Sequence, residues 1–348
     1  VYAAARGEHI FHALIAYLTS PLMRWRWAFL ILATASVFWA TREAGIGRVV
    51  TLIQIYGVGL VFYDAARHLG ETLWVARATF VSAGLGAVYA LVAGLPSGSI
   101  RIAGIYENPN DLGIISLLAL ALFYAGADLG RRLWWRIAGH ALAMALIAAV
   151  LVSASRKALV GVVVIWALAA FFRRLRGRVA VQLGLGAASV AILLAASERF
   201  RVYWEIGVER LKVMFHWLSS PAGLDLSVVQ RSRFMEKGAE LMARAPVLGH
   251  GLDTFRWLSG EHKYAHSNYV ELGVSLGLIG LVVYYAYSVM LLVKAAEPRN
   301  RGLFGARMVL VFVAIMLLLD FGLVSYYSKL SGMIMVLAAG WLERRVPA

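Results

Sequence analysis

Long apolar runs recur along almost the whole of this 348-residue chain, and they constrain its fold more than any other feature. A helix needs about 20 predominantly apolar residues, with a range of about 17–25, to cross the hydrocarbon core of a bilayer. Helices and closed barrels are the structures that can do so with every backbone polar group paired. The runs therefore predict an all-α polytopic integral membrane protein, with spans at residues 25–41, 46–63, 73–95, 112–128, 134–154, 157–172, 179–197, 267–293, 308–324 and 329–342.

The composition supports this class and excludes several others. Hydrophobic residues make up 61% of the chain and charged residues 15%, whereas a soluble domain is about 45–50% apolar and about 25% charged. The absence of cysteine excludes disulfides and thiolate sites. No cleavable signal peptide is visible, and Phe11 to Leu18 is too short to span, so we expect it in the membrane interface. The chain opens with Val, and we expect one or two spans upstream.

The chain carries 34 Lys and Arg against 19 Asp and Glu, a formal net charge of +15. A surplus of this size in a soluble protein would suggest nucleic acid as a partner. Alternating spans place most of it on one side, which the positive-inside rule makes cytoplasmic, so no nucleic-acid partner is predicted. The clusters are Arg131, Arg132 and Arg136; Arg173, Arg174, Arg176 and Arg178; Lys294, Arg299, Arg301 and Arg307; Arg344 and Arg345; with Arg24, Arg26 and Arg67.

The opposite side receives one long segment, residues 198–266, which carries ten Lys or Arg and eight Asp or Glu. Loops of this length are uncommon unless they form a lid or a binding site. Apolar positions at spacings of three and four predict helices at 202–218 and 232–244. We therefore expect three parts: N-terminal membrane helices at 1–197, a helical external loop at 198–266, and C-terminal membrane helices at 267–348.

Two short loops on the external side combine cations with hydrogen-bonding groups. The first runs from Arg101 to Asn108-Pro109-Asn110-Asp111, where Asn-Pro-Asn signals a turn and Asn110 or Asp111 can cap the next helix, so a structural turn and a substrate loop are both open. The second is Ser153-Ala-Ser155-Arg156-Lys157. Its cations either snorkel to lipid headgroups or meet an anion, for which Arg offers a bidentate fork and Ser a hydroxyl.

Two further motifs follow in and after the long segment. Arg231-Ser-Arg233 lies on an amphipathic helix that ends before Pro246-Val-Leu-Gly249-His250-Gly251. This Gly-x-Gly lacks a third glycine and a preceding strand, so it is no dinucleotide fingerprint, and Arg231 alone is open to interpretation as a solvated charge. Tyr264-Ala-His266-Ser267-Asn268-Tyr269 precedes Gly273, Gly277 and Gly280, which would permit close helix packing. His262 and His266 lack a clear third ligand, so no metal site is predicted.

These residues resemble a known family. His266-Ser267, nine residues, Gly277, two residues and Gly280 match the H-[NSQ]-x9-G-x-x-[GTY] signature of bacterial O-antigen ligases. Arg231, a helix and Pro-x-x-Gly-x-Gly resemble the wider ligase and polymerase superfamily, whose R-x3-L element appears here as Arg231-x3-Met235. Ser155-Arg156 and the segment from Arg101 to Asn110 resemble two further blocks, so that the resemblance covers most of residues 95–345.

The resemblance implies a GT-C-like membrane glycosyltransferase with two more spans than the ten counted above. It implies transfer of O-antigen from undecaprenyl diphosphate to lipid A core in lipopolysaccharide biosynthesis, on the periplasmic face of the bacterial inner membrane. No metal and no cofactor are expected. The sugars and the oligomeric state are left open.

The resemblance also implies roles for particular side chains. His266 would accept the acceptor's proton, and Arg156 and Arg231 would bind the diphosphate, so that direct displacement inverts the anomeric configuration. Weaker substrate-binding candidates are Arg101, Lys157, Arg233, Ser155, Asn108, Asn110, Ser267 and Tyr269, with Trp257 and Tyr264 as further aromatic surfaces for sugars.

Two alternative functions remain. An O-antigen or exopolysaccharide polymerase, or a protein O-oligosaccharyltransferase, would use the same donor class with another acceptor. A transporter of lipid-linked saccharide would carry charges within its spans, whereas ionisable residues are rare there and Asp320 is the main exception.

Overall fold

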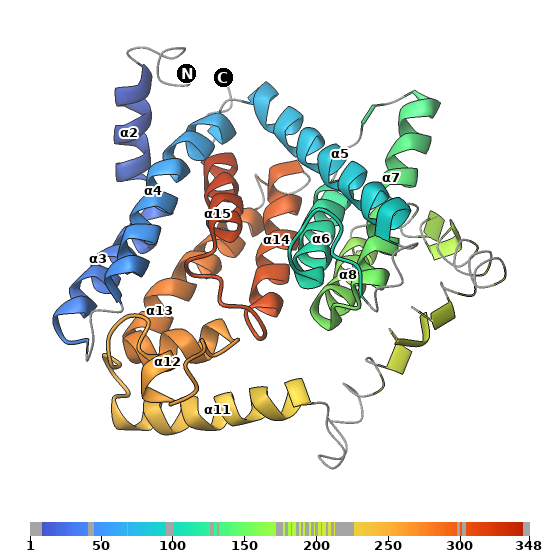
Figure 1. Cartoon of the computed structure of the whole chain (residues 1–348). Helices are drawn as coiled ribbons and strands as arrows, with labels where there is room; N and C mark the ends of the chain where they lie inside the picture. Colours follow the sequence, from blue (N-terminus) through green and yellow to red (C-terminus); the bar gives the residue numbers. More distant parts are fainter. Residues whose placement is uncertain are drawn as a thin grey trace. The chain divides into compact units, whose positions relative to one another are not determined.

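The structure, a computed structural model, forms helices and no strand among the residues that it describes (Figure 1). These are residues 9–40, 45–67, 69–94, 101–125, 129–130, 132–171, 226–297, 300 and 304–343, with scattered single positions between 177 and 212. The predicted all-α fold class is confirmed for this part of the chain.

The chain divides into two compact units. One unit combines both ends of the chain, residues 1–72 and 226–348, and the other consists of residues 73–225. Of the predicted site residues, Arg231 and His266 belong to the first unit and Arg101 and Arg156 to the second. Each unit is therefore described by itself.

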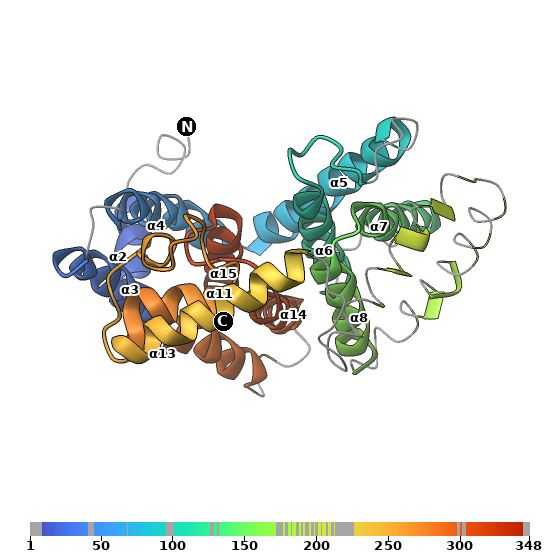
Figure 2. The same cartoon turned by 60° about the horizontal axis from the view of Figure 1, so that its bottom comes forward.

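The first unit is built on two long apolar helices and the shorter ones that pack on them. Its elements are α2 (His9–Thr19), α3 (Met23–Ala35) with the 3₁₀ turn Ser36–Phe38, α4 (Gly45–Arg67), α11 (Leu226–Arg244), α12 (Phe255–Leu258), α13 (Asn268–Ala296), α14 (Phe304–Leu319) and α15 (Lys329–Leu342). Helix α15 packs on α4, and α13 packs on α3, α14 and α11 (Figures 1 and 2). A buried hydrophobic cluster in this unit includes Phe29, Leu52, Leu252, Leu272 and Tyr326.

The second unit is centred on one buried helix. Its elements are α5 (Leu69–Gly94), which begins at the boundary, α6 (Pro109–Ala125), α7 (Leu133–Ser153) and α8 (Arg156–Phe171). Helix α6 packs against both α7 and α8, and every residue from Leu112 to Ala125 except Ile115 is buried. A helix that is apolar on all sides suits this central position, because it has no face that needs water.

Among the residues that the structure describes, four helices are long and apolar enough to cross a membrane: Gly45–Arg67, Leu73–Gly94, Leu133–Ser153 and Asn268–Ala296. Helices Pro109–Ala125, Gly305–Leu319 and Lys329–Leu342 are apolar but shorter. Large apolar side chains such as Phe38, Trp74 and Val92 are exposed, as expected of a surface that contacts lipid. The features indicate a helical membrane protein, and the number of spans stays a prediction.

Each predicted apolar segment that is described overlaps a helix, and the predicted helix 232–244 lies within α11. The spans 25–41 and 308–324 extend beyond their helices, because the 3₁₀ turn after α3 ends at Phe38 and α14 ends at Leu319. The predicted span 179–197 and helix 202–218 fall largely outside the described residues. So do the loops at 41–46 and 96–100 and the basic clusters at 173–178 and 344–345.

Helix α13, which covers the predicted span 267–293, is interrupted at Gly277. The backbone of Gly277 is non-helical, with φ 63° and ψ −161°. The reason is a loop that inserts at this point.

Candidate functional site

The loop of residues 245–251, which follows α11, fills the interruption in α13. His250 N and Gly251 N donate hydrogen bonds of 2.9 and 2.8 Å to the carbonyl oxygens of Val274 and Ser275. On the other side of the break, Leu278 N and Ile279 N donate to Pro246 O and Val247 O at 2.8 and 3.2 Å. The backbone groups that the broken helix leaves open are therefore paired with the loop, as a buried backbone requires.

Glycines on both partners make this contact possible. A Cβ added to Gly277 would lie 2.4 Å from the carbonyl carbon of Val247, and one added to Gly249 would lie 2.5 Å from that of Ser275. Gly249 also has a positive φ of 66°. The two glycine motifs found in the sequence are thus two halves of one structural contact, and Gly249-x-Gly251 serves backbone packing.

His266 lies at a strained turn directly before α13. Its φ is 55°, in the left-handed region that non-glycine residues rarely adopt. Such a conformation costs about 1–3 kcal/mol and persists only where the surroundings enforce it. The imidazole is half-buried, stacks parallel to Phe234 with centroids 5.8 Å apart, and lies 4.2 Å from the Tyr264 ring. The ring is therefore held in one place with part of its surface exposed.

Helix α11 brings Arg231 to the same region. Phe234 is fully buried with Phe255, Ala265 and Val274, which anchors α11 over the start of α13 (Figure 2). Arg231 is half-buried and lies three residues before Phe234, and residues three apart on a helix are neighbours on its surface. Arg233 faces elsewhere: its side chain is 63% exposed and lies 3.8 Å from the Glu261 carboxylate.

The residues that follow His266 anchor the turn to the segment after α14. Asn268 is fully buried, and its Oδ1 accepts hydrogen bonds from Ser325 N and Tyr326 N at 3.0 and 3.1 Å. Its Nδ2 donates to the Asp320 carboxylate at 3.3 Å, and its backbone N donates to Asp320 O at 2.8 Å. The Ser267 hydroxyl also donates to Asp320 O, at 3.3 Å.

Asp320, which follows the end of α14, is 2% exposed. Its carboxylate accepts hydrogen bonds from neighbouring side chains, which include Asn268 Nδ2. Another of these bonds comes from the Tyr285 hydroxyl at 2.8 Å. The carboxyl group that the sequence marked as an exception is thus a buried structural partner of Asn268.

The aromatic candidates are engaged to different degrees. The Tyr269 hydroxyl donates to Leu317 O at 2.9 Å, and its ring contacts Tyr285 and Phe321. Tyr264 and Trp257 are 36% and 39% exposed. The latter two therefore offer more ring surface to a ligand than Tyr269 does.

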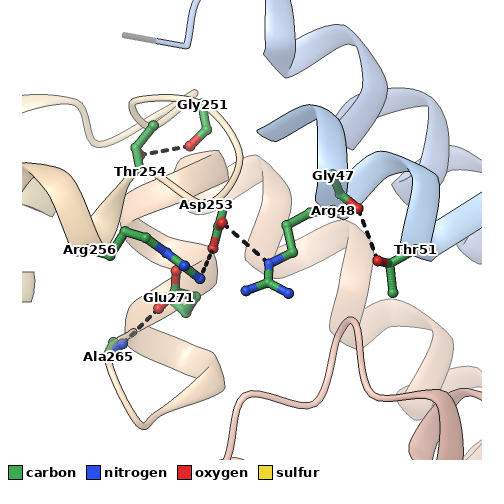
Figure 3. Close-up of polar contacts among 9 residues, drawn as sticks. All are labelled: Gly47, Arg48, Thr51, Gly251, Asp253, Thr254, Arg256, Ala265 and Glu271. Carbon is green, nitrogen blue, oxygen red and sulfur yellow. Dashed lines mark hydrogen bonds and ion pairs between the residues drawn. The ribbon is translucent and has the colours of Figure 1, made fainter. Parts of the chain in front are cut away.

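Sequence reasoning missed a charged cluster beside this turn (Figure 3). Asp253, only 4% exposed, forms ion pairs with Arg48 Nε at 3.3 Å and Arg256 Nη2 at 2.9 Å. Arg48 also lies 4.0 Å from the centroid of the Tyr327 ring. Figure 3 shows Glu271 next to Arg256, with its carboxylate accepting a 2.8 Å hydrogen bond from Ala265 N. The sequence does contain one sign of this cluster: Glu271 is a charged residue in an apolar segment, five residues after His266.

In the second unit, Arg101 joins the two predicted loops. Its Nε donates to Ser153 O at 2.9 Å and its Nη2 donates to Asn110 Oδ1 at 2.9 Å. Asn108 Oδ1 accepts from Asn110 N at 2.9 Å, at the start of α6. The cap at the start of α6 is therefore Asn108, and the prediction of Asn110 or Asp111 is wrong, because the Asn108 side chain accepts from the backbone of Asn110 itself. Arg101 braces the turn between α7 and α8.

That turn is tight and closely packed. Ala154 has a φ of 48°, and a Cβ added to Gly113 of α6 would lie 2.7 Å from Ser153 Oγ and 2.9 Å from Ser155 Cβ. The Ser155 hydroxyl oxygen is buried without a hydrogen-bond partner among the described residues. Arg156 and Lys157, both half-buried, begin α8 directly after it.

The predicted site residues are divided between the two units. The first unit contains Arg231, Arg233, His266, Ser267 and Tyr269, and the second contains Arg101, Asn108, Asn110, Ser155, Arg156 and Lys157. Within the described residues, no group of three or more His, Cys, Asp or Glu is placed to hold a metal ion.

Comparison with known protein families gives a match for part of the chain. Residues 141–285 match the family model described as O-antigen ligase. No curated protein matches the chain at a significant level. The matched range includes the 153–157 turn, α11, the 245–251 loop, His266 and Gly277, and it leaves out the segment 101–111.

Proposed function

Because the chain is a member of the O-antigen ligase superfamily, we propose that it transfers a preassembled polysaccharide from undecaprenyl diphosphate to a sugar of the lipid A core. The observation that carries the proposal is the placement of His266. Its imidazole is held by two aromatic rings on a strained turn, next to the helix face that carries Arg231.

The proposed role of His266 is that of a general base. An imidazole with the ordinary pKa of about 6.5 is suited to accept a proton near neutral pH, and such help contributes about 10²–10⁴-fold to a rate. Because backbone strain concentrates at functional sites, the φ of 55° at His266 supports a functional role for this residue.

Arg231 is proposed to hold the diphosphate of the donor. A guanidinium forms charge-assisted hydrogen bonds to phosphate oxygens, each contributing about 1.5–3 kcal/mol. Half-burial on the α11 face beside His266 supports this assignment for Arg231 more than for the exposed Arg233.

Arg156, with Ser155 and Lys157, is proposed as a second contact to the diphosphate on the basis of the resemblance. The buried Ser155 hydroxyl has no hydrogen-bond partner in the described part of the chain, at the first turn of a helix that begins with two cations. Helix N-termini favour anions, which supports an anion here. Arg101 already donates to Ser153 and Asn110, so its contribution would be to brace this turn.

The proposed reaction is a direct displacement. The acceptor hydroxyl loses its proton to His266 as its oxygen forms a bond to the anomeric carbon. The bond from that carbon to the phosphate oxygen breaks, and undecaprenyl diphosphate leaves with the electron pair. Arginine charges stabilise the developing negative charge on the leaving group, and the anomeric configuration inverts.

The proposed setting is the bacterial inner membrane with the active site on the periplasmic face. The support is the positive-inside bias of the basic clusters, which makes the opposite side external. Residues 198–266 would then form an external segment between the membrane helices of 1–197 and 267–348.

The test is transfer in vitro with a defined lipid-linked donor and a lipid A core acceptor. Asparagine tolerates a positive φ, so His266→Asn removes the imidazole without adding backbone strain. His262→Asn is the matched control, since His262 is exposed and has a φ of 53°. We expect His266→Asn to lose at least about 10²-fold in rate, and His262→Asn to retain the wild-type rate. Equal activity of both variants would refute the base role.

Product analysis in the same assay tests the acceptor. Polysaccharide attached to lipid A core is the expected product. A longer lipid-linked polymer or a glycosylated protein would replace the ligase assignment by one of the alternative transferases.

A further inference from the structure

Glu271 is a buried carboxyl group that the proposed reaction does not use. It lies in the first turn of α13 with 0% of its surface exposed. Its Oε2 accepts a hydrogen bond from Ala265 N at 2.8 Å, while its Oε1 is buried and has no hydrogen-bond partner among the described residues. Burying a carboxyl group that is only partly hydrogen-bonded is unfavourable, so stability alone does not account for its presence.

The hydrogen bond from Ala265 reaches backward past the start of the helix. Ser267 is the N-cap of α13, so the Glu271 side chain contacts the residue two positions before the cap. The residue between them is His266. On its other side, Ser267 and Asn268 bond to Asp320 O. His266 is thus held at both flanks, by Glu271 on one side and by Asp320 on the other.

This arrangement explains how the left-handed backbone at His266 is maintained. The Phe234 and Tyr264 rings contact the imidazole, but a ring contact does not determine the φ of the residue that carries it. The hydrogen bond at Ala265 N fixes the peptide plane before residue 265, and the bonds from Ser267 and Asn268 to Asp320 O fix the chain after His266, so that together they restrict the backbone between them. Figure 3 shows the Glu271 carboxylate directed at Ala265 N and adjacent to Arg256, which is itself paired with Asp253.

We propose that Glu271 is a positioning residue for His266: its carboxylate holds the Ala265 amide and thereby sets the turn that presents the imidazole to the acceptor hydroxyl. This inference rests on the proposed function, since it assumes that His266 reacts with the acceptor. The positioning requires a side-chain oxygen on residue 271 that accepts the hydrogen bond from Ala265 N. It does not require the negative charge of the carboxylate.

The substitutions that separate these features are Glu271→Gln and Glu271→Ala. Glutamine keeps a side-chain oxygen that can accept from Ala265 N, and alanine does not. We expect Glu271→Ala to lower kcat by about 10²-fold, the effect of a small misplacement of a catalytic group, with a nearly unchanged KM for the donor. Glu271→Gln should keep most of the wild-type kcat. Glu240→Ala is the control, because Glu240 lies on the exposed surface of α11 and pairs with Lys237.

A double-mutant cycle with His266→Asn tests whether the two residues act together. If Glu271 acts through His266, the double variant His266→Asn with Glu271→Ala should be no slower than His266→Asn alone. Additive losses would overturn the positioning role, and so would a Glu271→Gln variant as slow as Glu271→Ala. Wild-type activity of His266→Asn would instead refute the proposed function, which distinguishes the two failures.

Hydrogen exchange provides a readout that does not depend on activity. In purified protein, the Ala265 amide should exchange faster in Glu271→Ala than in wild type, and at the wild-type rate in Glu271→Gln. Unchanged exchange at Ala265 in Glu271→Ala would overturn the proposal even if that variant were inactive.

Discussion

The interruption of α13 at Gly277 gives the most direct test of the fold around the site, through the substitution Gly277→Ala. The backbone there has φ 63° and ψ −161°, a region that is essentially restricted to glycine, so alanine costs about 1–3 kcal/mol in strain. The new Cβ would lie 2.4 Å from the carbonyl carbon and oxygen of Val247. Because these are backbone atoms, the loop must move away.

That movement breaks the hydrogen bonds nearest the contact, from Leu278 N to Pro246 O and from Ile279 N to Val247 O. Each contributes about 0.5–1.5 kcal/mol to stability. Strain and lost hydrogen bonds together predict that Gly277→Ala lowers the free energy of unfolding by about 2–6 kcal/mol.

The measurement is unfolding in mixed detergent micelles, followed by tryptophan fluorescence. Gly57→Ala in α4 is the matched control, because Gly57 is helical and an added Cβ meets nothing within 4 Å. Alanine there should stabilise the protein by about 0.5–1 kcal/mol. A change of less than about 0.5 kcal/mol in the free energy of unfolding is typical of a surface substitution. Such a small change in Gly277→Ala would show that the inserted loop does not maintain the interruption of α13.

Two further predictions follow from single side chains. Arg101→Ala removes the hydrogen bonds to Ser153 O and Asn110 Oδ1, so it should lower the melting temperature, and an unchanged value would show that the brace contributes nothing. The Asp320 carboxylate accepts hydrogen bonds from Asn268 Nδ2 and the Tyr285 hydroxyl, so Asp320→Ala leaves two donors without their acceptor. Each unpaired buried donor costs about 1–3 kcal/mol, so the melting temperature should fall, and an unchanged value would refute the role of Asp320 in anchoring the turn.

The helical architecture follows from hydropathy, because apolar runs of membrane length have few other structures open to them. The interruption in α13 does not follow from it. Gly273, Gly277 and Gly280 look alike in sequence, and only the inserted loop distinguishes Gly277 from the others. Local patterns report the periodicity of a helix but not the distant backbone that packs on it.

The candidate site divides in the same way. His266 and Arg231 are visible in sequence because their motif spacings are specific, and Phe234, three residues after Arg231, stacks on the His266 ring. Asp253 and Arg48 escape notice, because an ion pair between residues 205 positions apart leaves no local pattern. Arg26, counted among the basic residues of one membrane side, is buried against the Tyr56 and Tyr287 rings, since its neighbours come from two other helices.

The contact between the 245–251 loop and the interrupted α13 also limits how this protein can be recombined. The loop and α13 contact each other through backbone atoms at Gly249 and Gly277. A substitution to a smaller side chain therefore cannot adapt either segment to a different sequence in the other. A chimera that imports the loop from a relative must import residues 274–279 with it. The two segments must therefore be exchanged together. The 22 residues between Gly251 and Val274, which include the turn at His266, separate them in the sequence.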